Sequence, residues 1–224
     1  MFQIRPYQLF RLFDAPANAR DVHVQVPFRR GYGSLTLLES MVLLASLRAV
    51  RAKTVFEFGT FLGGTTLNIA LNIPADGQVF TLDLGDNAEI DQHVEDARIT
   101  STRRAAPALD FKGSAVEKKV VELKGDSTKF DYSPWAGSVD LAFIDGGHDL
   151  ETVRSDTVNA FSLVKTAPPA AVLWHDYHNK DYPELSQYLD ALSADRPIFH
   201  IGDTMICAWF NDAAGEFISS LQDQ

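Results

Sequence analysis

Cysteine is almost missing from this chain, because its 224 residues contain only Cys207. An internal disulfide is therefore excluded, and nothing in the sequence calls for an oxidising compartment. Glycine and proline are also few, at 14 and 10 residues. These numbers exclude collagen-like and low-complexity chains, and the apolar share of 46% is typical of a globular domain.

Positive charge is scarce as well. The 20 Lys and Arg residues stand against 30 Asp and Glu residues, and the formal net charge is −10. Nucleic-acid binding needs a basic surface that neutralises phosphates, so we expect no nucleic-acid partner. The acidic balance is compatible with a ligand that carries positive charge.

Long apolar runs are lacking too. The most apolar window, 35–50, is interrupted by Glu39 and Arg48 and is too short and too polar to span a bilayer. The first residues do not read as a secretion leader, because Arg5, Pro6 and Arg11 break the apolar stretch. We therefore expect no membrane partner and a cytoplasmic location.

From residue 54 onward, short apolar runs alternate with longer segments of helical periodicity. The runs are rich in β-branched and aromatic residues and almost continuously apolar, as in strands buried on both faces of a parallel sheet. The expected strands are 54–58, 78–82, 119–123, 139–144 and 171–174, and the expected helices are 35–50, 64–72, 88–104, 150–164 and 183–193. Repeated strand–helix units predict an α/β fold with a doubly wound, mostly parallel, Rossmann-like sheet.

The two ends of the chain depart from this pattern. Two further strands, 197–201 and 205–210, are separated by three residues and predict an antiparallel hairpin at the C-terminal edge of the sheet. Residues 35–224 are expected to form a single domain, and residues 1–34 an arm that precedes it. Arg29, Arg30 and Tyr32, flanked by glycines, suggest a lid in this arm, with a plain surface linker as the alternative.

Acidic side chains stand at the end of every predicted parallel strand. They are Glu57, Asp83, Asp126, Asp145 and Asp176. In an open α/β sheet, ligands bind outside the carboxyl ends of the strands. Helix N-caps would explain some of these acids, but not Glu57, which lies inside its strand. We therefore predict a binding site at this edge of the sheet.

A glycine-rich turn follows the first of these strands. Residues 57–66 read Glu-Phe-Gly-Thr-Phe-Leu-Gly-Gly-Thr-Thr, which departs from the Gly-x-Gly-x-x-Gly spacing of dinucleotide sites. The Glu57 carboxylate would repel a pyrophosphate but attract an ammonium or sulfonium group. Asp83 lies 24 residues after Gly59, near the spacing of about 20 residues at which an acid binds ribose hydroxyls. Together these features predict an adenosyl ligand without phosphates.

Residues 55–66 and 80–83 resemble the first two motifs of class I S-adenosylmethionine-dependent methyltransferases. Residues 125–127, 139–148 and 172–177 resemble the small-molecule O-methyltransferase branch, which includes macrocin- and catechol-type enzymes. The resemblance covers roughly residues 35–210. It implies methyl transfer from S-adenosylmethionine to a hydroxyl of a small-molecule acceptor. The cofactor site that it implies comprises Glu57 at the methionine end, Asp83 at the ribose, Asp126 and Ser127 at the adenine, and in addition Gly59, Thr60, Gly63 and Asp145.

The resemblance also implies a divalent metal, magnesium or manganese. Asp145 and Asp176 match two of the family's ligand positions, but Tyr177 stands where catechol-type enzymes have asparagine. His175 is our candidate for the third ligand, with His178 as the alternative. A histidine ligand would favour manganese, iron or zinc over magnesium. In the competing interpretation, Asp176 is a cap or contacts the substrate, and the histidines are wall residues.

His148 is our candidate for the group that accepts the proton of the acceptor hydroxyl, because histidine titrates near neutral pH. Asp145 and His175 complete the predicted catalytic set, and His178 is a rival base. Two other functions stay open: an NAD-dependent oxidoreductase, which the glycine spacing disfavours, and a non-catalytic cofactor-binding scaffold, which the strand-end acids disfavour. The acceptor (a sugar hydroxyl, a phenol or an amine) and the oligomeric state, with a homodimer as one candidate, are also left open.

Overall fold

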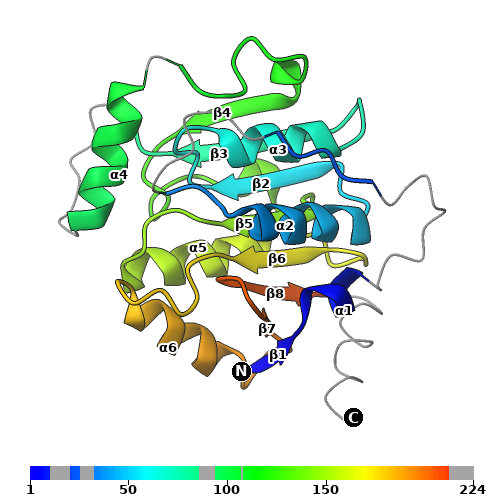
Figure 1. Cartoon of the computed structure of the whole chain (residues 1–224), viewed down its shortest axis with the longest axis vertical. Coiled ribbons are helices and arrows are strands. Elements are labelled where there is room, and N and C mark those ends of the chain that lie inside the picture. The colour runs from blue at the N-terminus through cyan, green and yellow to red at the C-terminus, as the bar shows by residue number, and fades with distance from the viewer. Residues whose placement is uncertain (11–20, 26–32, 86–93, 107, 212–224) are drawn as a thin grey trace.

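The computed structural model describes residues 1–10, 21–25, 33–85, 94–106 and 108–211. An eight-stranded sheet runs through this part of the chain in the order β1-β7-β8-β6-β5-β2-β3-β4 (Figure 1). The strands are β1 (Phe2–Ile4), β2 (Thr54–Phe58), β3 (Gln78–Asp83), β4 (Val120–Lys124), β5 (Leu141–Ile144), β6 (Ala171–Trp174), β7 (Phe199–Ile201) and β8 (Ile206–Phe210). The helices are α1 (Pro6–Phe10), α2 (Leu37–Ala49), α3 (Gly64–Asn72), α4 (Val94–Ala105), α5 (Leu150–Leu163) and α6 (Pro183–Leu192), with 3₁₀ turns η2 (Glu117–Lys119) and η3 (Ser133–Trp135).

The pairing of the strands confirms the predicted fold class. Strands β2 to β6 pair in parallel, and β8 is antiparallel to both β6 and β7. The predicted hairpin is present, but it is not the outermost element, because β1 pairs in parallel with β7. This three-residue strand lies in the segment that we expected to be an arm. Residues 26–32, with most of the expected lid, lie outside the described part of the chain.

Both faces of the sheet are covered. Successive side chains of a strand point to opposite faces, so Val55 and Phe56 enter different cores. Val55 packs in a core with residues of α1, α2 and α3, whereas Phe56 packs with residues of α5 and α6. Helices α2 and α3 lie side by side over one face, as Figure 1 shows. No helix in the described residues is long and apolar enough to cross a membrane.

Helix α2 begins with a capping box. The Glu39 backbone N–H donates to Thr36 Oγ1 at 3.2 Å, and the Thr36 N–H donates to Glu39 Oε2 at 2.8 Å. These bonds satisfy backbone donors that a helix start otherwise leaves unpaired. The predicted helices 64–72, 150–164 and 183–193 agree with α3, α5 and α6 to within one residue at each end. Residues 88–93 of the predicted helix 88–104 lie outside the described part, and α4 covers the remainder.

Candidate active site

The order of the strands reverses at β2, which lies between β3 and β5. Open α/β sheets bind ligands in the crevice at such a switch point. Here the loops after β2 and β5 touch through their backbones: a Cβ on Gly59 would lie 2.2 Å from the Asp145 carbonyl oxygen. Gly59 also has φ of 90°, which favours glycine, and Phe61 adopts a strained φ of 47° in the same loop. The glycine turn is thus a fixed surface beside the loop that carries Asp145.

Gly63 ends this turn as the N-cap of α3. Its φ is 81°, and a Cβ there would lie 2.8 Å from the Phe111 ring. Glycine at this position therefore makes room for the Phe111 ring at the start of α3. The first backbone N–H groups of a helix have no partner within the helix and are available to a ligand.

Glu57 is fully buried under this turn. Its Oε2 accepts hydrogen bonds from Thr66 Oγ1 at 2.5 Å and Thr81 Oγ1 at 2.6 Å, and Thr60 Oγ1 lies 2.7 Å from Thr81 Oγ1. Desolvation raises the pKa of Glu57 to about 8, although both threonine bonds lower it, and Asp145 and Asp83 add to the rise. The geometry places Glu57 as a support of the loop, and its contact with the methionine end of a cofactor stays a prediction.

The two predicted nucleoside-binding positions lie at the ends of neighbouring strands. Asp83 accepts from the backbone N–H of Phe61 at 3.2 Å and from that of Leu84 at 2.8 Å. Burial raises its pKa, although Lys124 and these bonds lower it. Asp126 pairs with Lys129 at 2.7 Å and also accepts from Thr128, contacts that lower its pKa. Asp83 is therefore linked directly to the glycine turn.

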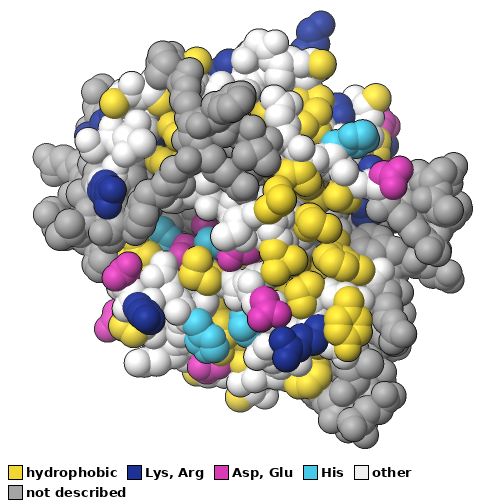
Figure 2. Space-filling model, in the orientation of Figure 1, with side chains coloured by type: hydrophobic (Ala, Val, Ile, Leu, Met, Phe, Trp, Pro, Cys, Tyr) yellow, Lys and Arg dark blue, Asp and Glu magenta, His cyan; other side chains and the backbone are white. Residues whose placement is uncertain are grey.

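A cluster of charged side chains lies at the ends of β5 and β6. Asp145 and Asp176 each offer a carboxylate oxygen and His148 a ring nitrogen, and these three atoms all lie within 4.8 Å of one another. His148 Nε2 is 2.8 Å from Asp176 Oδ2. The Tyr182 ring, which is 6% exposed, stacks on the His148 ring at 4.0 Å with an interplanar angle of 8°. Figure 2 shows histidine and acidic side chains gathered at a hollow in this face of the molecule.

Asp176 is the centre of this cluster. It accepts from Asn179 Nδ2 at 2.6 Å through Oδ1, and its Oδ2 faces both His148 and His175. Burial raises the pKa of Asp176, but the hydrogen bonds and charges of His148 and His175 outweigh this effect and hold the pKa well below its usual range. Its backbone has φ of 62°, which is uncommon outside glycine. Strained residues of this kind collect at functional sites.

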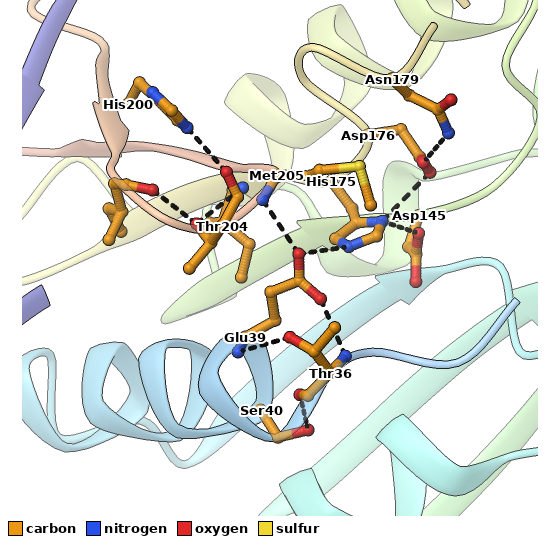
Figure 3. Close-up of polar contacts among 12 residues, drawn as sticks. Thr36, Glu39, Ser40, Asp145, His175, Asp176, Asn179, His200, Thr204 and Met205 are labelled. Atoms are coloured by element: carbon orange, nitrogen blue, oxygen red, sulfur yellow. Dashed lines mark hydrogen bonds and ion pairs between the residues drawn. The ribbon is translucent and has the colours of Figure 1, made fainter. Parts of the chain in front are cut away.

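His175 is enclosed by three carboxylates (Figure 3). Its Nδ1 lies 3.1 Å from both Asp145 Oδ1 and Asp176 Oδ2, and its Nε2 lies 3.5 Å from Glu39 Oε1. Desolvation lowers its pKa, but these acids outweigh it and raise the pKa well above the ordinary value. With both nitrogens turned to carboxylates, His175 is held as a hydrogen-bond donor in this arrangement, and its parts in catalysis and metal binding stay predictions.

Glu39 is a site residue that the sequence analysis did not single out. Besides Thr36 and His175, it binds the backbone N–H of Met205, which donates to Oε1 at 2.9 Å. It therefore joins the start of α2, the end of β6 and the turn before β8, as Figure 3 shows. The Thr-x-x-Glu pattern at residues 36–39 signals a capping box, but nothing in it indicates the contact with His175.

Most of the predicted site residues come together at one edge of the sheet. Glu57, Gly59, Thr60, Gly63 and Asp83 surround the glycine turn, Asp126 and Ser127 follow β4, and Asp145, His148, His175 and Asp176 form the adjoining cluster. His178 is exposed and stacks on Tyr177, and the group of close ligand atoms does not include it. Tyr182 and Asn179 are further contacts of the cluster, and their spacing in the sequence gave no signal of it.

The donor chemistry of this cluster fits a divalent metal. Asp145 and Asp176 offer carboxylate oxygens and His148 offers an imidazole nitrogen, all within reach of one ion. A mixed set of oxygen and nitrogen ligands suits manganese, iron or zinc better than magnesium. The group of close ligand atoms contains His148, and the place of His175 as a metal ligand stays a prediction.

With the fold and the site described, comparison with known proteins defines the class. Residues 56–177 match the family model described as a methyltransferase domain, so the chain belongs to that family. The expected resemblance to methyltransferases is thereby confirmed. No curated protein sequence matches the chain.

Solved structures with the same fold include three methyltransferases. The O-methyltransferase TomG from Streptomyces achromogenes, involved in tomaymycin synthesis and solved with S-adenosylmethionine, is 16% identical, with a TM-score of 0.55 over 92% of this chain and 88% of that one. The Bacillus cereus O-methyltransferase with S-adenosylhomocysteine is 15% identical, with a TM-score of 0.55 over 90% of each chain. The methyltransferase PaMTH1 from Podospora anserina with S-adenosylhomocysteine is 15% identical, with a TM-score of 0.57 over 80% and 81%. At these identities the likeness establishes the fold.

Proposed function

We propose that this protein transfers a methyl group from S-adenosylmethionine to a hydroxyl of a small molecule. The observation that carries the proposal is the contact between two half-sites at the switch point. The glycine turn after β2 lies directly against the loop that brings Asp145 to His148 and Asp176. A cofactor on the turn would thus lie beside a polar cluster suited to bind and deprotonate an acceptor. Solved relatives of the same fold bind S-adenosylmethionine or its product.

The cofactor end of the site is assigned along the carboxyl edges of β2, β3 and β4. Gly59, Thr60 and Gly63 form the turn under the methionine part, and Asp83 binds the ribose hydroxyls. Asp126 and Ser127 line the adenine end. Asp145 is the acid with partial exposure beside Gly59, at 21% for its side chain, so it is better placed than the buried Glu57 to meet the ammonium group.

In the reaction, the acceptor oxygen forms a bond to the methyl carbon while the carbon–sulfur bond breaks. The electron pair of that bond goes to sulfur, which becomes the neutral thioether of S-adenosylhomocysteine. The hydroxyl proton goes to His148, which Asp176 orients through Nε2 at 2.8 Å and Tyr182 holds by stacking. Holding the reacting atoms in line supplies about 7–11 kcal/mol of the barrier.

A divalent metal, where bound, would be held by Asp145, His148 and Asp176, and His148 would then serve as a ligand and not as the base. Such an ion would supply a Lewis acid that lowers the pKa of an acceptor hydroxyl. His175, whose two nitrogens face carboxylates, keeps Asp145 and Asp176 in position from below. We include metal assistance as part of the proposal, and its test is separate from that of methyl transfer.

The proposal is tested by calorimetric titration with S-adenosylhomocysteine, with NADH as the control ligand. We expect micromolar binding of the former and none of the latter. Turnover is then measured with radiolabelled S-adenosylmethionine and a panel of sugar, phenol and amine acceptors. His148→Ala should lower kcat by 10²–10⁴-fold, the range of general-base catalysis, with little change in cofactor affinity. Binding of NADH alone would favour an oxidoreductase. Cofactor binding without turnover on any acceptor would favour a scaffold.

A cytoplasmic location and a homodimeric assembly accompany this proposal. The single cysteine is buried, which is compatible with a reducing compartment. Sedimentation analysis of the purified chain checks the assembly. The acidic net charge supports a small-molecule acceptor over a nucleic acid.

A further inference from the structure

Residues 21–25 lie along α3 and form a segment that we call the strap (Figure 1). Its side chains alternate: Val22 and Val24 are partly buried against the core that contains residues of α2 and α3, whereas His23 and Gln25 are exposed. This alternation is typical of an extended chain with one buried face. In the described part of the chain, however, no strand pairs with the strap. Its backbone groups must therefore find other partners.

Two asparagines of α3 provide these partners. Asn72 Oδ1 accepts from the His23 N–H at 2.8 Å, and Asn72 Nδ2 donates to the His23 carbonyl oxygen at 2.7 Å. Asn68 binds Gln25 in the same way, at 2.7 Å and 3.1 Å. The spacings agree, because four residues of a helix rise about 6 Å and two residues of an extended chain span about 6.6 Å. The strap is therefore bound through its backbone rather than through the exposed side chains of His23 and Gln25.

The same contacts lead to the glycine turn after β2. Asn68 Nδ2 also donates to the carbonyl oxygen of Gly64 at 2.9 Å, and Gly64 is the first residue of α3, next to the Gly63 N-cap. A Cβ on Gly33, the next described residue after the strap, would lie 3.2 Å from Phe61 Cε1. Phe61 belongs to the glycine turn. The N-terminal part of the chain thus meets this turn at two separate places.

Burial makes the strap and the two asparagines depend on each other. Asn68 and Asn72 are 8% and 3% exposed, within a helix of nine residues. Asparagine is a weak helix former, so packing alone would favour an apolar residue at both positions. Without the strap, each buried amide would lose two hydrogen bonds, and unpaired buried polar groups cost free energy. Docking of the strap therefore stabilises α3 from its first residue to its last.

We propose that the strap is a positioning segment for cofactor binding, an inference that rests on the proposed function. Docked on Asn68 and Asn72, it holds the start of α3 and the glycine turn in the arrangement that binds S-adenosylmethionine. Coupling of this kind is reciprocal, so a bound cofactor stabilises the docked strap by the same factor. The contacts of the strap are with α3 and, through the Asp21 carbonyl oxygen, with Arg48 of α2. We therefore expect it to act on cofactor affinity and not on the transfer step.

Proline substitutions remove the backbone donors of the strap selectively. Proline has no N–H group, and its fixed φ is compatible with an extended chain. The double variant His23→Pro/Gln25→Pro should raise the Kd of S-adenosylhomocysteine, measured by calorimetry, about fivefold or more, the lower end of typical coupling. The double variant His23→Ala/Gln25→Ala loses the same two side chains but keeps both N–H groups. It is the matched control, and its Kd should stay within about twofold of the wild type.

A change on the helix side separates the strap from the start of α3. Asn72→Ala removes two bonds to His23 but leaves the bond between Asn68 and Gly64 in place. It should therefore raise the Kd in the same direction as the proline variant. Asn159→Ala, which changes a partly buried asparagine of α5, is its control and should bind as the wild type does.

Hydrogen exchange and kinetics distinguish a positioning role from a purely structural one. Saturating S-adenosylhomocysteine should slow amide exchange of the strap about fivefold or more in the wild type. The double proline variant should raise the KM for S-adenosylmethionine while kcat at saturation stays within about twofold.

Three results would overturn the inference. The first is an unchanged Kd in the double proline variant while its strap exchanges faster than in the wild type, and the second is strap exchange that does not respond to the ligand. If the proline variant does not fold, Asn72→Ala with faster strap exchange and an unchanged Kd has the same meaning. These results leave the proposed function intact, whereas a wild type that does not bind S-adenosylhomocysteine overturns the proposed function and the inference with it.

Discussion

Replacing Glu39 with glutamine tests how the active-site cluster is held in place. Glu39 is 2% exposed and serves three groups: the Thr36 N–H, the Met205 N–H and the His175 ring. Glutamine keeps the size of the side chain but removes the negative charge, and its NH2 group replaces one of the two oxygens that accept from the Thr36 and Met205 N–H groups. The variant therefore removes the charge beside His175 together with one of these hydrogen bonds.

The magnitude follows from the pKa of Glu39. Desolvation raises this pKa, but His175, Met205 and Thr36 outweigh it and lower the pKa from 4.5 to about 2. A carboxyl whose pKa is depressed in the folded state stabilises the fold above its unfolded pKa, and this contribution is lost as pH falls through the folded pKa. A shift of this size corresponds to about 3 kcal/mol at neutral pH. We expect Glu39→Gln to lose about 2–3 kcal/mol of unfolding free energy at pH 7.

The assay is urea unfolding of wild type and variant between pH 3 and pH 8. The deficit of the variant should be full at pH 5 and shrink as pH falls from 4.5 toward 2, because the wild-type carboxyl then becomes protonated as well. Glu184→Gln, which changes an exposed acid in the first turn of α6, is the control and should stay within about 0.5 kcal/mol. A variant as stable as the wild type at pH 7, or a deficit that is the same at pH 3 and pH 7, would refute this account.

Four further predictions concern the site. Gly59→Ala should destabilise the fold by about 2 kcal/mol or more and abolish S-adenosylhomocysteine binding, because the new Cβ would lie 2.2 Å from the Asp145 carbonyl oxygen. Thermal unfolding with and without the ligand measures the stability and the binding. Asp176→Asn should lower kcat about 10²-fold or more while the Kd of S-adenosylhomocysteine stays within about threefold, since Asp176 orients His148; an unchanged kcat contradicts this role. Tyr182→Phe should keep near-normal turnover and Tyr182→Leu should not, because only phenylalanine preserves stacking on His148. Asp145→Asn should weaken manganese binding about tenfold or more by calorimetry, and full activity of EDTA-treated wild type would rule out metal assistance.

Much of the sheet could be predicted because its central strands are buried on both faces. Strands β2 and β6 have the same first and last residues as the expected strands. Short, continuously apolar segments between turns are typical of strands buried on both faces, so their ends are easy to locate in the sequence. Strand β1 was missed for two physical reasons. Its three residues are too few to show a period, and it pairs with β7 across almost the whole chain, so no local pattern signals the contact.

The candidate site also has a part that could be predicted from the sequence and a part that could not. Asp145 and Asp176 could be placed together because parallel strands bring their carboxyl ends to one edge. The contacts of each histidine could not be predicted, because they depend on side-chain directions and on distant elements. His175 faces Glu39 of α2, and His148 stacks on Tyr182 at the start of α6. These contacts, rather than the spacing of the histidines, distinguish one residue from the other.

The backbone contact between Gly59 and Asp145 also limits how the protein can be re-engineered. The two loops leave no room for a side chain between them, so neither can be lengthened or given bulk without displacing the other. Efforts to change acceptor preference should therefore leave both loops intact. Lys180 and Asp181 offer a better target, because these exposed residues lie between Asn179 and Tyr182, which contact Asp176 and His148. A library of substitutions confined to these two positions would change the surroundings of the cluster while the contacts that hold His148 and Asp176 stay in place.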